Sequence, residues 1–257
     1  MISKKLLQWL NIVTFIAAVI INYLAISLPL GYGSTQKLSD DIPNLFVPSG
    51  LTFSIWGIIY ILLGIFSVYQ LRDIFKSEKI EMPYLGKISY FFIISNLTNF
   101  SWILLWHYKL VPLSLVAMFI ILVSLLLIYI RLDIGKTEVS RTEKIAVHAP
   151  FSVYLGWITV ATIANVTAVL ADSTGFFKVV PDDLLAEILT ILVIAVAVLI
   201  TYLMLFLRKD WVYSLVIVWA VLGIYLKQSG LIAITALIAV IIVAIGIVYT
   251  GFKLLRK

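Results

Sequence analysis

The chain contains no cysteine, and the long apolar segments that make up most of it contain almost no charged residues. The absence of cysteine excludes disulfide bonds, thiolate-bound metals and iron–sulfur clusters. It leaves the redox compartment undetermined, because a protein without thiols is compatible with either side of a membrane. Charged residues are only 12% of the sequence, so the chain has few groups for acid–base chemistry.

What is abundant is apolar surface. Apolar residues make up 63% of the sequence, and the mean hydropathy is +1.12, whereas a soluble domain has about 45–50% apolar residues. A soluble fold of this length could not cover so much apolar surface. Lipid accepts it, provided that each crossing segment satisfies its own backbone hydrogen bonds as a helix. We therefore expect an all-α fold: a polytopic membrane helix bundle.

Apolar runs long enough to cross a bilayer, which takes about 20 residues, recur along the whole chain. They predict eight transmembrane helices, although a count of seven with a re-entrant hairpin also fits, because the seventh run is short. The runs are Trp9–Leu30, Leu51–Leu71, Ile88–Trp106, Leu110–Ile130, Pro150–Leu170, Leu184–Leu207, Trp211–Leu226 and Leu231–Phe252.

Basic residues give an independent test of this count, because cytoplasmic loops carry an excess of Lys and Arg. With eight spans and both termini cytoplasmic, fifteen basic residues fall on the inner side and four on the outer side. The outer four are Lys37, Lys109, Lys178 and Lys227. Topology thus explains the formal charge of +6 without a nucleic-acid partner. We expect an integral protein of a bacterial cytoplasmic membrane, surrounded by membrane lipids.

Motifs for conventional catalysis are missing. The sequence has no glycine-rich phosphate loop, no HExxH motif and no nucleophile elbow. Glu187 lies at the start of the sixth span, where a carboxylate stabilises a helix N-terminus. His107 and His148 fall on opposite sides of the membrane, so they cannot share a metal. Hydrolysis and ion-coupled transport are disfavoured, no metal site is expected, and an enzyme is not favoured.

The junction from Pro48 to Gly64 is where a polar loop becomes the second span. Proline cannot sit inside a helix, so the helix should begin after Pro48, with Ser49 as its N-cap. Trp56 and Tyr60 are four residues apart and project to the same side. Packing against a neighbouring helix and lining of a cavity are both compatible with this pair.

Polar and aromatic residues also recur on one side of two other spans. In the third span the pattern is Asn96, Asn99, Trp102 and Trp106, and in the fifth it is Tyr154, Trp157, Ala161 and Asn165. An asparagine facing lipid would leave its amide unsatisfied, so these faces should meet protein or a cavity. The topology places most of these residues in the outer half, below the loop 31–50. A pocket of indoles and amides there suits a flat, apolar ligand.

These residues resemble the TspO/MBR family, the tryptophan-rich sensory proteins that include the translocator protein. The resemblance rests on the junction after Pro48 with Trp56 and Tyr60, on the Asn99–Trp102 pair, and on the segment WITVATIAN from Trp157. It divides the chain into a TspO-like five-helix bundle, residues 1–171, and a three-helix C-terminal extension, residues 172–257.

The resemblance implies a pocket under the first long loop that binds a tetrapyrrole such as protoporphyrin or haem, or a lipid, with a sensing or transport role. No cofactor is required, and a homodimer is compatible with the family. The alternative is a small-molecule or lipid permease that is not specific for porphyrins. Gly50 stands where the family usually has a tryptophan, and Asn96 could take the place of Asn99. By position, the ligand-binding residues would be Phe46, Pro48, Trp56, Tyr60, Asn99, Trp102, Trp157 and Asn165.

Overall fold

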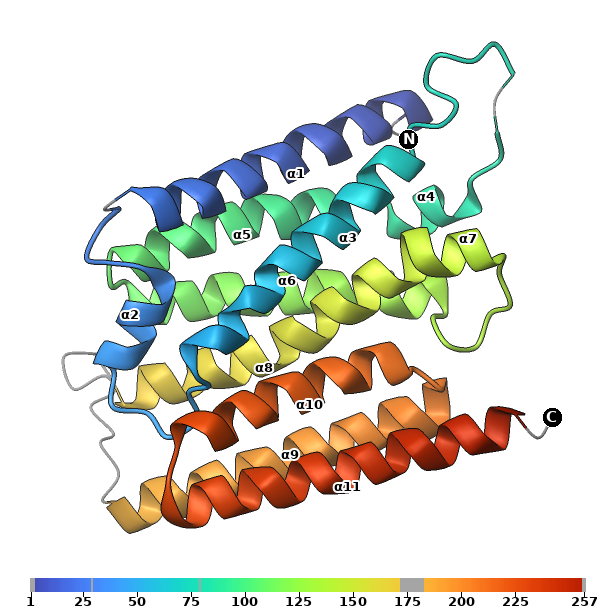
Figure 1. Cartoon of the computed structure of the whole chain (residues 1–257). Helices are drawn as coiled ribbons and strands as arrows, with labels where there is room; N and C mark the ends of the chain where they lie inside the picture. The colour runs from blue at the N-terminus through green and yellow to red at the C-terminus, as the bar shows by residue number, and fades with distance from the viewer. Residues whose placement is uncertain (1–2, 29, 79, 172–182, 256–257) are drawn as a thin grey trace.

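The computed structural model describes residues 3–28, 30–78, 80–171 and 183–255. Its described part is built from helices, and eight long ones run side by side (Figure 1). They are α1 (Lys4–Ser27), α3 (Ile55–Tyr69), α5 (Phe91–His107), α6 (Val111–Leu132), α8 (Ala149–Ala171), α9 (Asp183–Arg208), α10 (Trp211–Lys227) and α11 (Gly230–Leu255).

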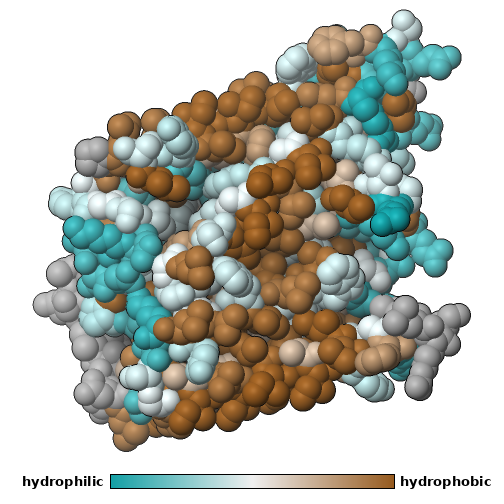
Figure 2. All heavy atoms as spheres, in the orientation of Figure 1, coloured by the Kyte–Doolittle hydropathy of each residue, from teal (hydrophilic) through white to brown (hydrophobic). Residues whose placement is uncertain are grey.

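The eight long helices coincide with the eight predicted spans, and the polytopic all-α fold is confirmed. Among the described residues, six helical segments are long and apolar enough to cross a membrane, and α10 is a shorter apolar helix of 17 residues. The α5 helix, also 17 residues long, runs beside α1 and α6. Apolar side chains cover the helix flanks, whereas hydrophilic ones gather at the two ends of the bundle (Figure 2). This is the surface that a bilayer requires.

The start of α1 and the end of α11 lie at the same end of the bundle, which we call the termini end (Figure 1). This agrees with an even number of spans. The opposite end, the lid end, carries the short helix α2 (Thr35–Asp41) and the 3₁₀ turn η1 (Gly50–Ser54). At the termini end lie α4 (Pro83–Ile88), α7 (Arg141–Glu143) and the π-helical turn η2 (Lys144–His148). Which end faces the cytoplasm stays a prediction from the basic residues.

Two helix starts differ in detail from the sequence expectation. The second span begins after Pro48, as predicted, but through the 3₁₀ turn η1. Ser49 makes no capping bond to the backbone there, and its hydroxyl instead lies 3.2 Å from that of Thr52. The fifth span begins before Pro150, because α7 and η2 lead directly into α8. The wider π-helical turn gives the proline ring the space that a regular α-helix would deny it.

The C-terminal helices are joined to the first five by α10. It packs against α8 on one side and against α9 and α11 on the other, and it is the helix of the three that lies nearest the bundle (Figure 1). At Gly156 of α8 the two helices come close, since a Cβ there would lie 3.0 Å from the Cβ of Val216. The extension is therefore part of one packed assembly.

At the termini end, the buried carboxylate of Asp210 links α10 to α6 and α8. Asp210 is 5% exposed and caps α10 by accepting a hydrogen bond from the Tyr213 backbone N–H at 3.0 Å. Its other oxygen accepts hydrogen bonds from the Tyr129 hydroxyl of α6 at 2.8 Å and the Ser152 hydroxyl of α8 at 2.7 Å. Asp210 follows the sixth predicted span, and the tight turn after α9 carries it between α6, α8 and α10.

We predict that Asp210→Ala destabilises the bundle by about 2–4 kcal/mol. The substitution removes a helix cap, which costs about 0.5–2 kcal/mol, and leaves two buried hydroxyls without their acceptor, which costs about 1–3 kcal/mol each at most. Thermal unfolding in detergent measures the effect. The control is Asp41→Ala, because Asp41 is exposed at the end of α2. Equal unfolding temperatures for the two variants would contradict a role for Asp210 in the joint.

Candidate functional site

The segment between α1 and α3, which we call the lid, covers one end of the bundle, and its first half is hydrogen-bonded to α5. The backbone N–H of Tyr32 donates to the carbonyl of His107 at 3.0 Å, and the indole of Trp106 donates to the carbonyl of Thr35 at 3.2 Å. The His107 ring lies between the carbonyl of Leu30, at 3.2 Å, and the hydroxyl of Thr35, at 3.0 Å. His107 therefore has a structural role at the lid.

The helix within the lid, α2, was not predicted. Ser34 caps it by accepting a hydrogen bond from the Lys37 backbone N–H at 3.2 Å. A Cβ at position 50 would lie 2.0 Å from the side-chain amide of Gln36, the end of a flexible side chain. Gln36 thus occupies the space into which a larger residue at position 50 would project.

The second half of the lid is held by α8 and α10. Asn44 donates to the hydroxyl of Thr167 on α8 at 2.8 Å. Further along, the backbone N–H of Ser49 donates to the carbonyl of Gly223 at 2.9 Å, and the indole of Trp219 donates to the carbonyl of Thr52 at 3.0 Å. Helix α10 is therefore hydrogen-bonded to the turn with which the second span begins.

Glycine at position 223 makes this grip possible. A Cβ there would lie 2.0 Å from the hydroxyl oxygen of Thr52 and 2.9 Å from the Cβ of Pro48. Beyond it, Lys227 forms an ion pair with Asp40 of α2. We call these contacts of α10 with residues 40–52 the lid clamp. It is formed by a helix outside the first five spans, so the extension acts directly on the cover of the site.

Below the lid, aromatic rings converge on Trp56. Its ring stacks on Tyr60 with centroids 5.6 Å apart, and it lies 6.5 Å from Trp102 and 6.2 Å from Trp157. Tyr154 meets it edge-on at 6.1 Å. The three sequence patterns on α3, α5 and α8 are thus brought together, as their convergence predicted.

A small cavity lies within this aromatic cluster. Five of the eight predicted residues line it: Pro48, Trp56, Trp102, Trp157 and Asn165. Its volume is about 50 Å³. The other lining residues are Thr35, Ser39, Phe53, Trp106, Val160, Ala161 and Ala164. Trp106 and Ala161 lie on the predicted stripes, whereas Phe53 and the α2 residues gave no recognisable signal.

A larger groove adjoins the cavity. Its volume is about 380 Å³, and it shares Thr35, Phe53 and Trp56 with the cavity, so these residues stand between the two spaces. Tyr60 lines the groove rather than the cavity. The remaining lining residues are Asn22, Ile26, Ser34, Gln36 and Ser54. Six of the eight predicted residues therefore line the cavity or the groove.

The remaining two predicted residues, Phe46 and Asn99, line neither space. Phe46 is fully buried in the hydrophobic core. The side-chain oxygen of Asn99 accepts a hydrogen bond from Asn22 of α1 at 2.8 Å, while Asn96 donates to Thr14 of α1 at 3.4 Å. Both asparagines therefore face α1. The pattern within α5 did not show this, because it does not say which helix lies beside it.

Polar groups of the site fall into two classes. Asn165 is fixed: its oxygen accepts from the Trp102 indole at 3.0 Å, and its amide donates to the Ser114 hydroxyl at 3.1 Å. By contrast, the Trp157 indole nitrogen and the Tyr60 hydroxyl are buried and have no hydrogen-bond partner. Buried donors without partners are rare in folded proteins. These two atoms are the ones available to a ligand.

The site contains no charged side chain, and the described residues hold no cluster of three or more His, Cys, Asp or Glu that could bind a metal. Its chemistry is aromatic stacking plus two neutral hydrogen-bond donors. This arrangement suits binding of an apolar molecule.

A family model described as TSPO-like protein matches residues 8–249. The match continues through α9 and α10 and into α11, whereas the motif resemblance ended near Leu170. No curated protein and no solved structure matches the chain.

We predict that Gly223→Ala loosens the lid clamp, because the added methyl group must displace Thr52 or Pro48. Hydrogen exchange at the Ser49 amide, which donates to Gly223, should accelerate about tenfold, equivalent to about 1.4 kcal/mol. The matched control is Gly57→Ala on α3, where a Cβ meets open space. Unchanged exchange in Gly223→Ala would show that α10 does not restrain the lid.

Proposed function

The chain belongs to the TSPO-like protein family, and on that basis we propose that it binds a flat, apolar ligand in the aromatic site below the lid. The chemical classes that fit are a tetrapyrrole, such as protoporphyrin or haem, and a lipid. Stacking on indole rings supplies affinity for a flat molecule, and a few hydrogen bonds orient it.

The observation that carries the proposal is the pair of unpaired donors among the rings. Trp157 and Tyr60 each bury a hydrogen-bonding atom without a partner, and both rings contact Trp56. Leaving such groups unpaired costs about 1–3 kcal/mol each. A ligand with acceptor atoms on a flat ring system would recover this free energy while it stacks on the aromatic rings.

The volumes of the cavity and the groove limit where such a ligand can bind. Ligand pockets commonly have volumes of roughly 300–1,000 Å³, so the cavity of about 50 Å³ is too small by itself, whereas the groove of about 380 Å³ is large enough. Phe53 and Trp56 stand between the two spaces. We propose that the ligand occupies the groove and displaces these rings to reach Trp157.

The biological role that follows is sensing or transport across a bacterial cytoplasmic membrane, with the termini end inside. The excess of basic residues at that end supports this orientation. A sensor needs one binding site, whereas a permease needs a second opening. Flux of a bound pigment into proteoliposomes separates the two roles, and any small-molecule permeation without porphyrin binding would favour the alternative of a general permease.

We predict saturable quenching of tryptophan fluorescence when purified protein is titrated with protoporphyrin. Trp157→Phe keeps an aromatic ring but removes the unpaired indole donor, and Tyr60→Phe removes the unpaired hydroxyl. Each substitution should raise the Kd about fivefold to tenfold, equivalent to about 1–1.4 kcal/mol for one lost hydrogen bond.

The control for this titration is Trp211→Phe, because Trp211 is 54% exposed at the start of α10, far from the lid. Its Kd should match that of the unmodified protein. Absence of saturation would refute binding of this ligand, and an unchanged Kd in both site variants would refute the assignment of the site.

A further inference from the structure

A second set of unpaired polar atoms lies outside the aromatic site, where α1 meets α3 and α5. Buried polar side chains recur along one side of α1, at positions that face these two helices. They are Gln8, Asn11, Thr14 and Asn22, each no more than 8% exposed. Polar residues along the whole length of an apolar helix are costly in a membrane, so this face requires a physical explanation.

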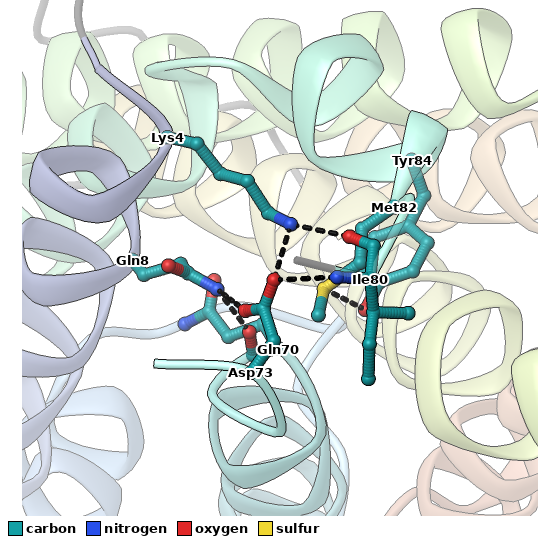
Figure 3. A network of polar contacts seen from close by, with 7 residues as sticks. All are labelled: Lys4, Gln8, Gln70, Asp73, Ile80, Met82 and Tyr84. Carbon is teal, nitrogen blue, oxygen red and sulfur yellow. Dashed lines mark hydrogen bonds and ion pairs between the residues drawn. The ribbon is translucent and has the colours of Figure 1, made fainter. Parts of the chain in front are cut away.

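At the termini end, the set begins with a charged network (Figure 3). The Lys4 ammonium lies 2.7 Å from one oxygen of Asp73, and the Gln8 amide donates to the other oxygen at 2.9 Å. The Ile80 backbone N–H donates to Asp73 at 3.0 Å. Burial acts to raise the pKa of Asp73, but these hydrogen bonds outweigh it and hold the pKa below its usual value. A charged carboxylate thus anchors this end.

One turn deeper into the bundle, the buried side chains have more hydrogen-bonding atoms than partners. The Asn11 amide donates to the side-chain oxygen of Gln70 at 2.9 Å. The Asn11 oxygen, the Gln70 amide nitrogen and the Ser67 hydroxyl have no partner, and all three residues are no more than 1% exposed. Rotating the side-chain amides of Asn11 and Gln70 by 180° would reverse the direction of the one hydrogen bond between them. Three atoms would still have no partner.

Toward the lid end, the polar set continues on α5. Asn96 donates to the Thr14 hydroxyl at 3.4 Å. Asn99 lies one turn further along α5, accepts from Asn22, and has an unpaired amide nitrogen. Asn22 also lines the groove together with Tyr60, whose hydroxyl is unpaired. The polar residues therefore extend from the charged network to the ligand groove.

We infer that the interface of α1 with α3 and α5 is a binding site for internal water molecules, which form a hydrated column between the termini end and the groove. Six buried side-chain atoms have no partner in the part of the chain that the structure describes, and four of them, on Asn11, Ser67, Gln70 and Asn99, lie along this interface. Lipid cannot supply hydrogen bonds to them. Buried water typically makes about three hydrogen bonds to such groups.

The column is suited to water and not to ions. Its unpaired atoms belong to amides and hydroxyls, which donate and accept single hydrogen bonds, and the charges of Lys4 and Asp73 neutralise each other at its end. It gives the polar side of the groove contact with the termini side of the membrane, while the lid closes the other side. A ligand entering the groove would meet the column at Asn22, which lines the groove and donates a hydrogen bond to Asn99.

Radiolytic labelling tests this inference, because hydroxyl radicals formed from a bound water oxidise the side chain beside it even when that side chain is buried. Leu63 lies one turn from Ser67 on α3, and Leu125 lies on α6 away from the column; both are no more than 1% exposed. After rapid mixing into water enriched in oxygen-18, we expect several-fold more label at Leu63 than at Leu125. Equal labelling of the two leucines would overturn the inference.

Two substitutions make the test specific. Asn11→Leu removes the unpaired oxygen of Asn11 and puts an apolar side chain in its place, so it should reduce the label at Leu63. Ser67→Ala distinguishes a wet interface from a dry one by thermal unfolding. In a dry interface, loss of an unpaired hydroxyl raises Tm, whereas in a hydrated one it lowers Tm through loss of a hydrogen bond to water.

The control for Ser67→Ala is Ser124→Ala on α6, where the hydroxyl donates to the Ile120 carbonyl of its own helix at 2.7 Å. A higher Tm for Ser67→Ala than for the unmodified protein would contradict the hydrated column. None of these readouts depends on ligand binding, so the inference and the proposed function can fail separately.

Discussion

Hydrocarbon offers no hydrogen bonds, so each polar side chain in this bundle must find its partner within the protein. That constraint sorts the buried polar residues into two groups. Asn165 and Asp210 are fully bonded, and each joins elements that are far apart in the sequence. Trp157 and Tyr60 are not bonded, and they lie together below the lid. The same constraint therefore identifies the rigid joints and the atoms that remain for a ligand or for water.

The lid is held by three helices rather than by its own packing. α5 bonds to the residues around α2, α8 bonds to Asn44, and α10 bonds to the turn η1. Because α10 belongs to the last three spans, the cover of the site cannot be understood from the first five helices alone. The family match through most of α11 agrees with a chain that works as one unit. The contacts of Gly223 show how closely the last three helices pack against the first five.

The sequence pattern identified the eight long helices through the length of their apolar runs, because lipid imposes a minimum length on each crossing. It also identified the aromatic stripes, since Trp56, Trp102 and Trp157 meet as expected. It missed α2, a short polar helix that tertiary contacts stabilise. Periodicity also says nothing about which helix lies beside which, and so Asn99 was expected at the ligand site when its partner is on α1.

The size of the site and the rigidity of the lid together determine how a ligand can be accommodated. The lid backbone is hydrogen-bonded to α5 and α10, so lifting it would break several bonds at once. Trp56 stacks on Tyr60, is tilted against Trp102 and meets Tyr154 and Trp157 edge-on, and each such contact is worth about 0.5–1.5 kcal/mol. We propose that rotation of Trp56 joins the groove with the cavity, because it leaves these hydrogen bonds of the lid intact. The ring at the centre of the aromatic cluster then acts as the movable wall, and the lid above it stays in place.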